Sequence, residues 1–213
     1  MSQAQAERSL APRDVPARST ELERVARAVD ARDGYTARHS RRVRELAIEI
    51  GRVLGFNDTS LALVAEAALF HDVGKLAVPD SILLKPRGLT KAEWEVMRAH
   101  SEEGARLLER LGVDAAAVAA VRHHHEHFDG SGYPVGLAGE EIPLFSRIIH
   151  VTDAFDSMTS DRAYRRARPM LEAIHELRAG VGEQFCPRCV RALEAHYENV
   201  ALRGATELGA AAR

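Results

Sequence analysis

Apolar residues recur every three or four positions along most of the chain, the spacing of helices that bury one face. No segment has the strict alternation of apolar and polar residues that is typical of half-buried strands. The clearest stripe lies in a helix expected from about Thr36 to Leu54, and its members are Val43, Leu46, Ala47, Ile50, Val53 and Leu54. The pattern therefore predicts an all-α protein.

Capping residues and helix breakers set the expected boundaries. Thr20-Glu21-Leu22-Glu23 and Thr90-Lys91-Ala92-Glu93 both have the form of a capping box. The predicted helices are Thr20–Ala31, Thr36–Leu54, Asn57–Phe70, a long one from Thr90 to Leu108, one from Asp114 through His125, Phe145–Ser157, Met170–Ala179 and Pro187–Ala201. We expect a disordered lead-in at 1–19, one domain at 20–202 and a frayed tail at 203–213.

Histidine and aspartate occupy positions where these helices need apolar residues. His39 lies four residues before Val43, and His71 follows the stripe of the helix that ends at Phe70. The whole set is His39, His71, Asp72, His100, His124, His125 and Asp153. Burying such groups without partners costs several kcal/mol each, whereas a shared metal centre satisfies all of them together.

The segment HHHEHFDGSGYP, from His123 to Pro134, holds four of the chain's ten histidines. Helical spacing separates them, because His124 and His125 continue the stripe of Val121 while His123 points away. His127 is expected where the helix gives way to a loop. The pattern therefore selects only two members of the run as inward-facing.

Imidazole and carboxylate groups without thiolates favour iron, manganese or zinc over a cysteine-type zinc site. Five histidines and two aspartates are too many for one ion, but two ions bridged by an aspartate use them all. Metal pairs roughly 4 Å apart are a common arrangement for hydrolysing phosphate esters.

Composition narrows the class of protein. The chain has 213 residues, 46% of them hydrophobic, and a net charge of −2, which excludes a bulk polycation for nucleic acid. No apolar run approaches the ~20 residues of a membrane span, and no signal core precedes the domain, so we expect a cytoplasmic protein. Cys186 and Cys189 are expected to be two thiols at a helix start, with a redox switch as the alternative.

Three segments together resemble HD-GYP domains, a bacterial branch of the HD metallohydrolase superfamily. They are HDVGKLAVPDSILLKPRGLTKAEWEVMRAH from His71, HHEHFDGSGYP from His124 and DAFDSMTSDRAYR from Asp153. The resemblance covers about Thr20 to Tyr197 and implies an all-α enzyme with a metal centre, often iron or manganese. It also implies hydrolysis of cyclic di-GMP, or of a related cyclic dinucleotide, to linear pGpG and possibly GMP.

The resemblance implies the same seven metal ligands. His39, His71, Asp72 and Asp153 are expected to hold one metal. Asp72 is then the catalytic bridge to a second metal, whose other ligands are His100, His124 and His125. Lys75, one of only three lysines, is expected to contact the scissile phosphate, although a chance lysine is the alternative.

Substrate contacts also follow from the resemblance. Arg162 and Arg165 match positions that grip phosphates, and Asp156 matches a position associated with substrate. Charge pattern alone is equally typical of solvated surface groups at all three. Some members bind a third ion through a glutamate one turn before the first histidine, where this chain has Tyr35. A phenol with a pKa near ~10 is a poor ligand, so we expect two metals, with Tyr35 lining the pocket or packing beside His39.

Gly130, Gly132 and Pro134 suit a tight turn beside the metal site, with Tyr133 expected to be exposed within it. The resemblance links this loop to partner proteins such as diguanylate cyclases or adaptors. Two other functions stay open: a weakly active receptor or scaffold for cyclic dinucleotides, and an HD phosphohydrolase acting on other nucleotides, which the loop disfavours.

Overall fold

Helices form the regular structure, as the apolar periodicity predicts. The structure, a computed structural model, describes residues 15–32, 38–161 and 166–211. Within those ranges it has no strand and only an isolated bridge between Val181 and Phe185, so the predicted all-α class is confirmed. The elements are α1 (Val15–Arg32), α2 (His39–Val53), α3 (Asp58–Phe70), η1 (Val73–Ala77), α4 (Asp80–Leu83), α5 (Lys91–Arg98), α6 (His100–Arg110), α7 (Ala115–Arg122), η2 (Gly139–Glu141), α8 (Leu144–Thr159), α9 (Met170–Ala179) and α10 (Pro187–Ala211).

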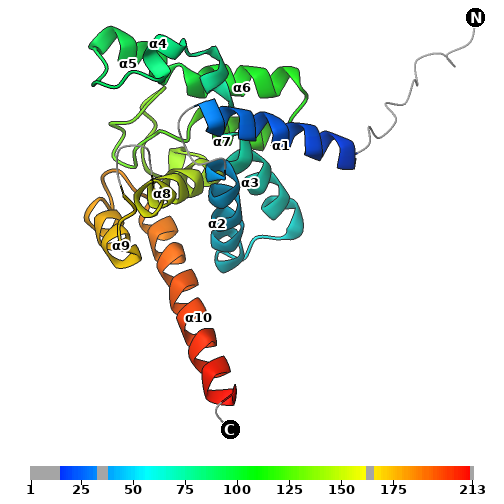
Figure 1. The fold of residues 1–213 in the computed structure, drawn as a ribbon, viewed down its shortest axis with the longest axis vertical. Helices are drawn as coiled ribbons and strands as arrows, with labels where there is room; N and C mark the ends of the chain where they lie inside the picture. The colour runs from blue at the N-terminus through cyan, green and yellow to red at the C-terminus, as the bar shows by residue number, and fades with distance from the viewer. Residues whose placement is uncertain (1–14, 33–37, 162–165, 212–213) are drawn as a thin grey trace, which may run out of the picture.

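The core forms where α2, α3, α7 and α8 pack together, and the predicted stripe of α2 faces it. Val43, Ala47 and Ile50 are completely buried, each at 0% exposure. Val64 and Ala68 of α3 are buried against them. Figure 1 shows α8 crossing the middle of the molecule, between α7 and the start of α10. The core thereby holds the ends of several helices close to one another.

A second group of elements lies at one end of the molecule. α4 and α5 occupy the top of Figure 1, next to α6. The capping box predicted at Thr90 is present, since the Thr90 hydroxyl accepts from the Glu93 N–H and Glu93 accepts from the Thr90 N–H. α5 nevertheless buries none of its residues, and Trp94 is 46% exposed. This helix therefore offers its side chains to solvent or to a ligand.

The single helix predicted from Thr90 to Leu108 is wrong, because the chain turns at Ala99. The His100 ring and the Ser101 hydroxyl donate to the carbonyls of Met97 and Arg98, which a continuous helix would use itself. The prediction of a helix through His125 is also wrong, since α7 ends at Arg122. Both breaks fall beside histidines of the candidate site.

The outermost helices are longer than predicted. α1 begins at Val15, five residues before the predicted start, with Pro16 in its first turn, where proline is favoured. α10 continues to Ala211 instead of ending near Ala201. Its last turns are rich in alanine, leucine and glutamate, which are strong helix formers. Figure 1 shows α10 projecting away from the other helices.

Candidate metal centre

Two groups of ligand atoms meet at Asp72. One group joins Asp72 to His100, His124 and His125, and the other joins it to His39 and His71; within each group the ligand atoms lie within 4.8 Å of one another. The residues come from helix ends: His39 opens α2, His71 caps α3, His100 opens α6, and His124 follows α7. Packing of these helices on the core brings together segments that lie far apart in the sequence.

Three rings in the cluster are held in the same tautomer by their own backbone. Nδ1 of His71, His100 and His124 lies 2.8, 2.7 and 2.6 Å from the carbonyl oxygen three residues earlier. A carbonyl only accepts, so each Nδ1 carries a proton, and in the neutral ring each Nε2 then presents a lone pair. Histidines that ligate metal commonly have this second hydrogen bond, which fixes the ring orientation.

The Nε2 atoms face one another and the carboxylate. His100 Nε2 lies 3.4 Å from His124 Nε2, 3.2 Å from His125 Nε2 and 3.4 Å from Asp72 Oδ1. On the other side, His71 Nε2 lies 3.3 Å from Asp72 Oδ2. Several acceptors converge in a buried space, where they repel one another unless a cation lies between them. The donor set therefore fits a divalent metal.

The second group of histidines is prepared for ligation by its surroundings. Burial lowers the pKa of His100, and it lowers the pKa of His124 and His125 well below the ordinary value. Neighbouring imidazoles act in the same direction on all three. These rings are consequently neutral near pH 7, which is the protonation state that binds metal.

The carboxylates beside the first group are ionised. Burial acts to raise the pKa of Asp72, yet the charge of Lys75, followed by that of nearby imidazoles, holds it well below the ordinary value. For His39, burial acts to lower the pKa, but Asp153 and Asp156 outweigh it and raise the pKa to about 9. In the absence of metal, a proton on His39 thus offsets part of the negative charge.

His39 lies between two aspartates of α8. Its Nε2 is 3.3 Å from Asp153 Oδ1, and its Nδ1 is 2.7 Å from Asp156 Oδ2. Asp156 is only 5% exposed and also accepts from the Arg42 guanidinium, at 2.5 and 2.9 Å. Asp153 thus faces the cluster, while Asp156 lies behind the ring and orients it. This position favours support of His39 over direct contact with a substrate.

Arg42 is the functional residue that the sequence did not single out. It follows His39 by three residues on α2, so the two side chains share a face of that helix. The three-residue spacing between His39 and Arg42 was the available signal in the sequence, but it did not identify Asp156 as their shared partner. Only the packing of α8 on α2 reveals that Asp156 joins the two side chains.

Lys75 extends from η1 to the cluster. Its Nζ lies 2.9 Å from Asp72 Oδ2, and its side chain is 12% exposed. The ammonium group is therefore beside the bridging carboxylate while it stays partly accessible. A phosphate approaching the metal centre would meet this charge.

A loop spanning residues 126–139, the GYP loop, closes one side of the cluster. Glu126 is 2% exposed and accepts from the N–H groups of Val135 and Gly136, at 2.9 and 3.0 Å. A Cβ on Gly132 would lie 2.2 Å from the His127 nitrogen, so only glycine fits this approach. The loop is thereby tied to the chain that carries the histidines.

The prediction that Tyr133 is exposed within the loop, beside the site without covering it, is wrong. Tyr133 is half-buried, and its ring stacks on His125 with the centroids 4.8 Å apart and the planes at 27°. The Arg98 guanidinium lies 5.3 Å from the centroid of the tyrosine ring. Stacking hides apolar ring surface that an open turn would expose to water.

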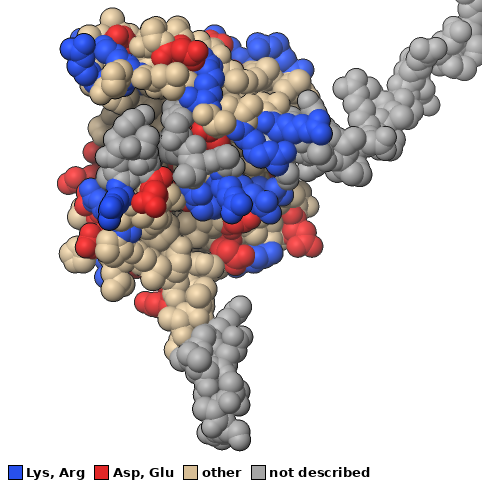
Figure 2. Space-filling view, in the orientation of Figure 1, with Lys and Arg blue, Asp and Glu red and all other residues tan. Residues whose placement is uncertain are grey.

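The remaining predicted residues lie elsewhere. His123 lies 3.4 Å from Glu126, His127 lies 2.9 Å from the Ser131 hydroxyl, and both are outside the two ligand groups. Tyr35, Arg162 and Arg165 fall outside the described residues. Figure 2 shows acidic and basic side chains interspersed over one face, in keeping with the small net charge.

The sequence model of one protein family, described as HD domain, matches residues 23–188. The cyclic di-GMP phosphodiesterase response regulator RpfG of Xanthomonas campestris pv. campestris is 44% identical over 175 residues, which cover 81% of this chain and 46% of that protein. A cyclic di-GMP phosphodiesterase of Thermotoga maritima is 40% identical over 168 residues, covering 76% and 44%. A 3'3'-cGAMP-specific phosphodiesterase 3 of Vibrio cholerae is 39% identical over 166 residues, covering 78% and 36%.

The chain thus spans less than half the length of these relatives. Solved structures share its fold as well. The cyclic GMP-AMP specific phosphodiesterase V-cGAP3 of V. cholerae superposes with a TM-score of 0.66 at 22% identity, over 84% of this chain and 49% of that one. The HD domain of the Listeria monocytogenes phosphodiesterase PgpH, in complex with cyclic-di-AMP, gives 0.57 at 13% identity, over 86% and 97%. The resemblance found in the sequence is confirmed.

Among the described residues, no helix is both long and apolar enough to span a membrane.

Proposed function

Because this chain belongs to the HD domain family, we propose that it is a metal-dependent phosphodiesterase that hydrolyses cyclic di-GMP or a related cyclic dinucleotide. The relatives described above carry that activity in their names, with cyclic di-GMP in two cases and cyclic GMP-AMP in another. Linear pGpG is the expected product, and a second hydrolysis would give GMP.

One observation carries the proposal: three imidazole Nε2 lone pairs of fixed tautomer converge on Asp72 beside the Lys75 ammonium. Such a convergence supports binding of a divalent metal, and the ammonium supports binding of an anion next to it. A phosphodiester is the anion that the relatives' names indicate. A receptor that binds cyclic dinucleotides without turnover would not require histidines whose tautomer is fixed for metal binding.

This chain's residues divide the work between them. When bound, divalent ions activate water and offset the charge that develops on phosphate oxygens. Asp72 lies between the two ligand groups and fits a bridging role. Lys75 donates toward the phosphoryl oxygens, and Asp156 with Arg42 keeps the His39 ring in place. Arg162, Arg165 and Tyr35 remain proposed contacts to the substrate.

We propose two metal ions, with His39, His71 and Asp153 on one and His100, His124 and His125 on the other. Asp72 belongs to both ligand groups, which supports the bridge. Iron or manganese suits a set of imidazoles and carboxylates without thiolate. Metal analysis after anaerobic purification tests the stoichiometry, and three bound equivalents would contradict it.

Turnover and metal content together test the function. We expect hydrolysis of cyclic di-GMP or cyclic GMP-AMP by the metal-loaded protein, loss of turnover with a chelator, and recovery with Fe²⁺ or Mn²⁺. Bis(p-nitrophenyl) phosphate, a phosphodiester without a base, reports on the metal centre alone. Full metal content with turnover of the nitrophenyl ester but of no cyclic dinucleotide would indicate a different phosphodiester substrate. Binding of cyclic dinucleotides without any turnover would indicate a receptor.

The GYP loop is also our proposed contact for a diguanylate cyclase or an adaptor. Val135 at this loop is 66% exposed, so this apolar side chain is accessible to a partner. Crosslinking through a cysteine at position 135, with position 171 on α9 as the exposed control, tests the contact. Equal crosslinking at both positions would contradict it.

A further inference from the structure

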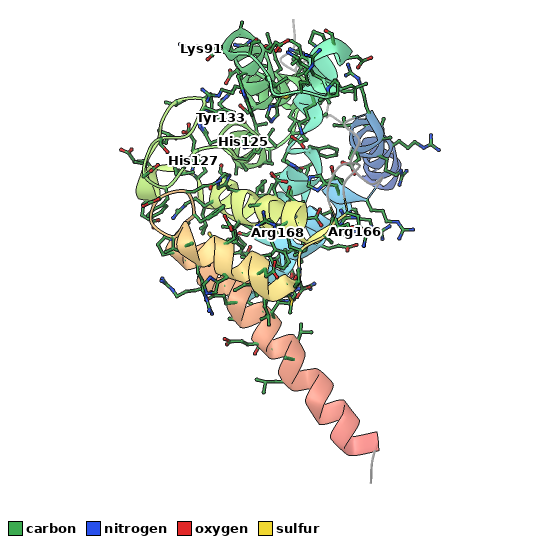
Figure 3. All side chains as sticks on the ribbon, turned by 60° about the vertical axis from the view of Figure 1, so that its left-hand side comes forward. Lys91, His125, His127, Tyr133, Arg166 and Arg168 are labelled. Atoms are coloured by element: carbon green, nitrogen blue, oxygen red, sulfur yellow. The ribbon has the colours of Figure 1, made fainter. Side chains whose placement is uncertain are left out.

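A groove of about 520 Å³ lies between α5 and the GYP loop, outside the two ligand groups. We call it the base groove and define it by Lys91, Trp94, Glu95, Arg98 and Tyr133. Figure 3 shows Tyr133 between Lys91 of α5 and His125 of the cluster, with His127 lower on the same loop. The groove thus begins next to the metal centre.

Tyr133 forms the wall between the base groove and the metal centre. One face of its ring stacks on His125, and the Arg98 guanidinium lies 5.3 Å from the ring centroid. Because His125 is in the second ligand group, a ligand in the groove is one aromatic ring away from that group. The groove and the second ligand group are thus separated by the thickness of the Tyr133 ring.

Trp94 also lines the groove and has no packing role in the core. α5 buries none of its residues, and the indole is 46% exposed. A large aromatic side chain open to a groove offers a flat face for stacking. Stacking of a nucleobase on an aromatic ring contributes about 1–3 kcal/mol. The pairing of Trp94 with Tyr133 and Arg98 therefore suits a planar base.

Glu95 gives the groove a preference between bases. Its carboxylate has no ion pair or side-chain hydrogen bond within the described part of the chain. Two carboxylate oxygens accept from two parallel donors, which guanine presents at N1–H and the N2 amino group. Adenine presents an acceptor at N1 instead, and a carboxylate repels it. Lys91 and Arg98 supply the positive charge that a nucleotide phosphate requires.

We propose that the base groove binds one guanine base of the substrate, stacked on Trp94 and recognised at its Watson–Crick edge by Glu95. This assignment rests on the proposed function, since it concerns the base attached to the phosphodiester at the metals. It makes Glu95 a specificity-determining residue that favours guanine-containing dinucleotides over adenine-containing ones. Cyclic di-GMP and the hybrid cyclic GMP-AMP each have a guanine for the groove, whereas cyclic di-AMP has none.

The first test measures binding without turnover. Trp94 is the chain's single tryptophan, so intrinsic fluorescence reports on the base groove alone. We expect GMP to quench this fluorescence with a Kd roughly tenfold lower than that of AMP, the factor that a bidentate base contact gives. Absence of quenching by GMP, or equal affinity for GMP and AMP, would overturn the proposal.

Variants identify the residues responsible. Glu95→Gln should reduce the GMP preference over AMP roughly tenfold, and it should narrow the ratio of kcat/KM for cyclic di-GMP over cyclic di-AMP by a similar factor. Val96→Ala is the matched control, because Val96 is 41% exposed on the same helix and does not line the groove. Trp94→Phe should bind GMP better than Trp94→Ala in calorimetry. An equal loss for both bases in Glu95→Gln would overturn base recognition by that carboxylate.

The outcomes also separate this inference from the proposed function. Quenching by GMP that depends on Glu95, without hydrolysis of any cyclic dinucleotide, would keep the guanine site and reject the phosphodiesterase. Hydrolysis of cyclic dinucleotides, with kcat/KM ratios that Glu95→Gln leaves unchanged, would keep the enzyme and reject the guanine site.

Discussion

Asp72 is the residue on which both halves of the candidate metal centre depend. Its two carboxylate oxygens face different histidines, with Oδ1 toward His100 and Oδ2 toward His71. Lys75 stabilises the ionised form from a third side. Asp153 lies beside His39 and belongs to neither of the two ligand groups that meet at Asp72, so it is not placed to replace Asp72.

Asp72→Ala should therefore abolish metal binding and turnover while it leaves much of the helical fold. The physical reason is that the variant removes the one negative ligand shared by both groups. Elemental analysis, activity and far-UV circular dichroism measure the three properties, and the exposed Asp58→Ala serves as control. Near-native activity with two bound metals in Asp72→Ala would show that the site assignment is wrong.

The histidine run offers a second test at the scale of single residues. His124→Ala and His125→Ala should lose metal, whereas His123→Ala should retain it, because His123 faces Glu126 instead of Asp72. Measurement of the metal content of the three purified variants tests this expectation. If only the His123 variant lost its metal, the register proposed here would be incorrect.

At the scale of elements, the site depends on the close packing of η1 against α6. Gly74 allows this approach, because a Cβ there would lie 1.8 Å from the His100 carbonyl oxygen and 2.5 Å from the Gly104 nitrogen. η1 follows directly after His71 and Asp72, and α6 begins with His100. The distance between these two elements therefore sets the distance between ligands.

Gly74→Ala should destabilise the fold by roughly 3 kcal/mol, as overpacking does, and should weaken metal binding by separating the ligands. Gly88→Ala is the matched control, because a Cβ at Gly88 meets nothing within 4 Å and its φ is not positive. Urea unfolding of the metal-free proteins and metal titrations measure both effects. If Gly74→Ala and Gly88→Ala had the same stability and the same metal affinity, the close approach of η1 to α6 would be contradicted.

Cys186, just before α10, is a titratable group outside the metal centre. Hydrogen bonding from Cys189, assisted by the Arg147 guanidinium 3.6 Å away, lowers the pKa of Cys186 to about 5. A thiolate next to a helix N-terminus and an arginine is stabilised in this way. Cys186 is therefore expected to be negatively charged at neutral pH.

Thiolate absorbance at 240 nm should accordingly rise with pH around a midpoint of about 5. Cys186→Ser should remove that transition, and Arg147→Met should shift it to higher pH because the thiolate loses its cation. Lys85→Met, far from α10 in the sequence and paired with Glu93, is the control for removal of a charge. A transition that begins only above pH 8 in the parent protein would contradict the lowered pKa.

For the whole molecule, the metal centre acts as a crosslink between helices. Its candidate ligands come from α2, α6, α8 and the segments that follow α3 and α7. Without metal, the core of the molecule contains converging lone pairs and carboxylates, an arrangement that opposes folding. Metal binding and fold stability are therefore coupled.

Chelation should lower the free energy of unfolding by about 4 kcal/mol relative to protein in metal at a thousandfold excess over Kd. The reason is mass action, since the assembled ligand set exists only in the folded state. Urea titrations with and without chelator measure the difference. Asp72→Ala is the control and should show none. An unchanged midpoint for the parent protein would mean that the cluster binds no metal under those conditions.

The sequence by itself determined the helical class and most helix boundaries, and it singled out the seven polar residues of the candidate metal centre. These features follow from local spacing, because a helix places residues three and four apart on one face whatever it later packs against. The helix beyond Ala201 was missed although its residues are strong helix formers. The break at Ala99 was missed because it depends on side-chain hydrogen bonds of His100 and Ser101 to the backbone.

Tertiary structure alone decided how the side chains meet. Asp156 supports His39 with Arg42, Tyr133 covers His125, and Trp94 faces a groove instead of the core. Each of these relations joins segments far apart in the chain, and their distances depend on how helices pack. Periodicity reveals that a side chain points inward, but only the packed helices determine what it points at.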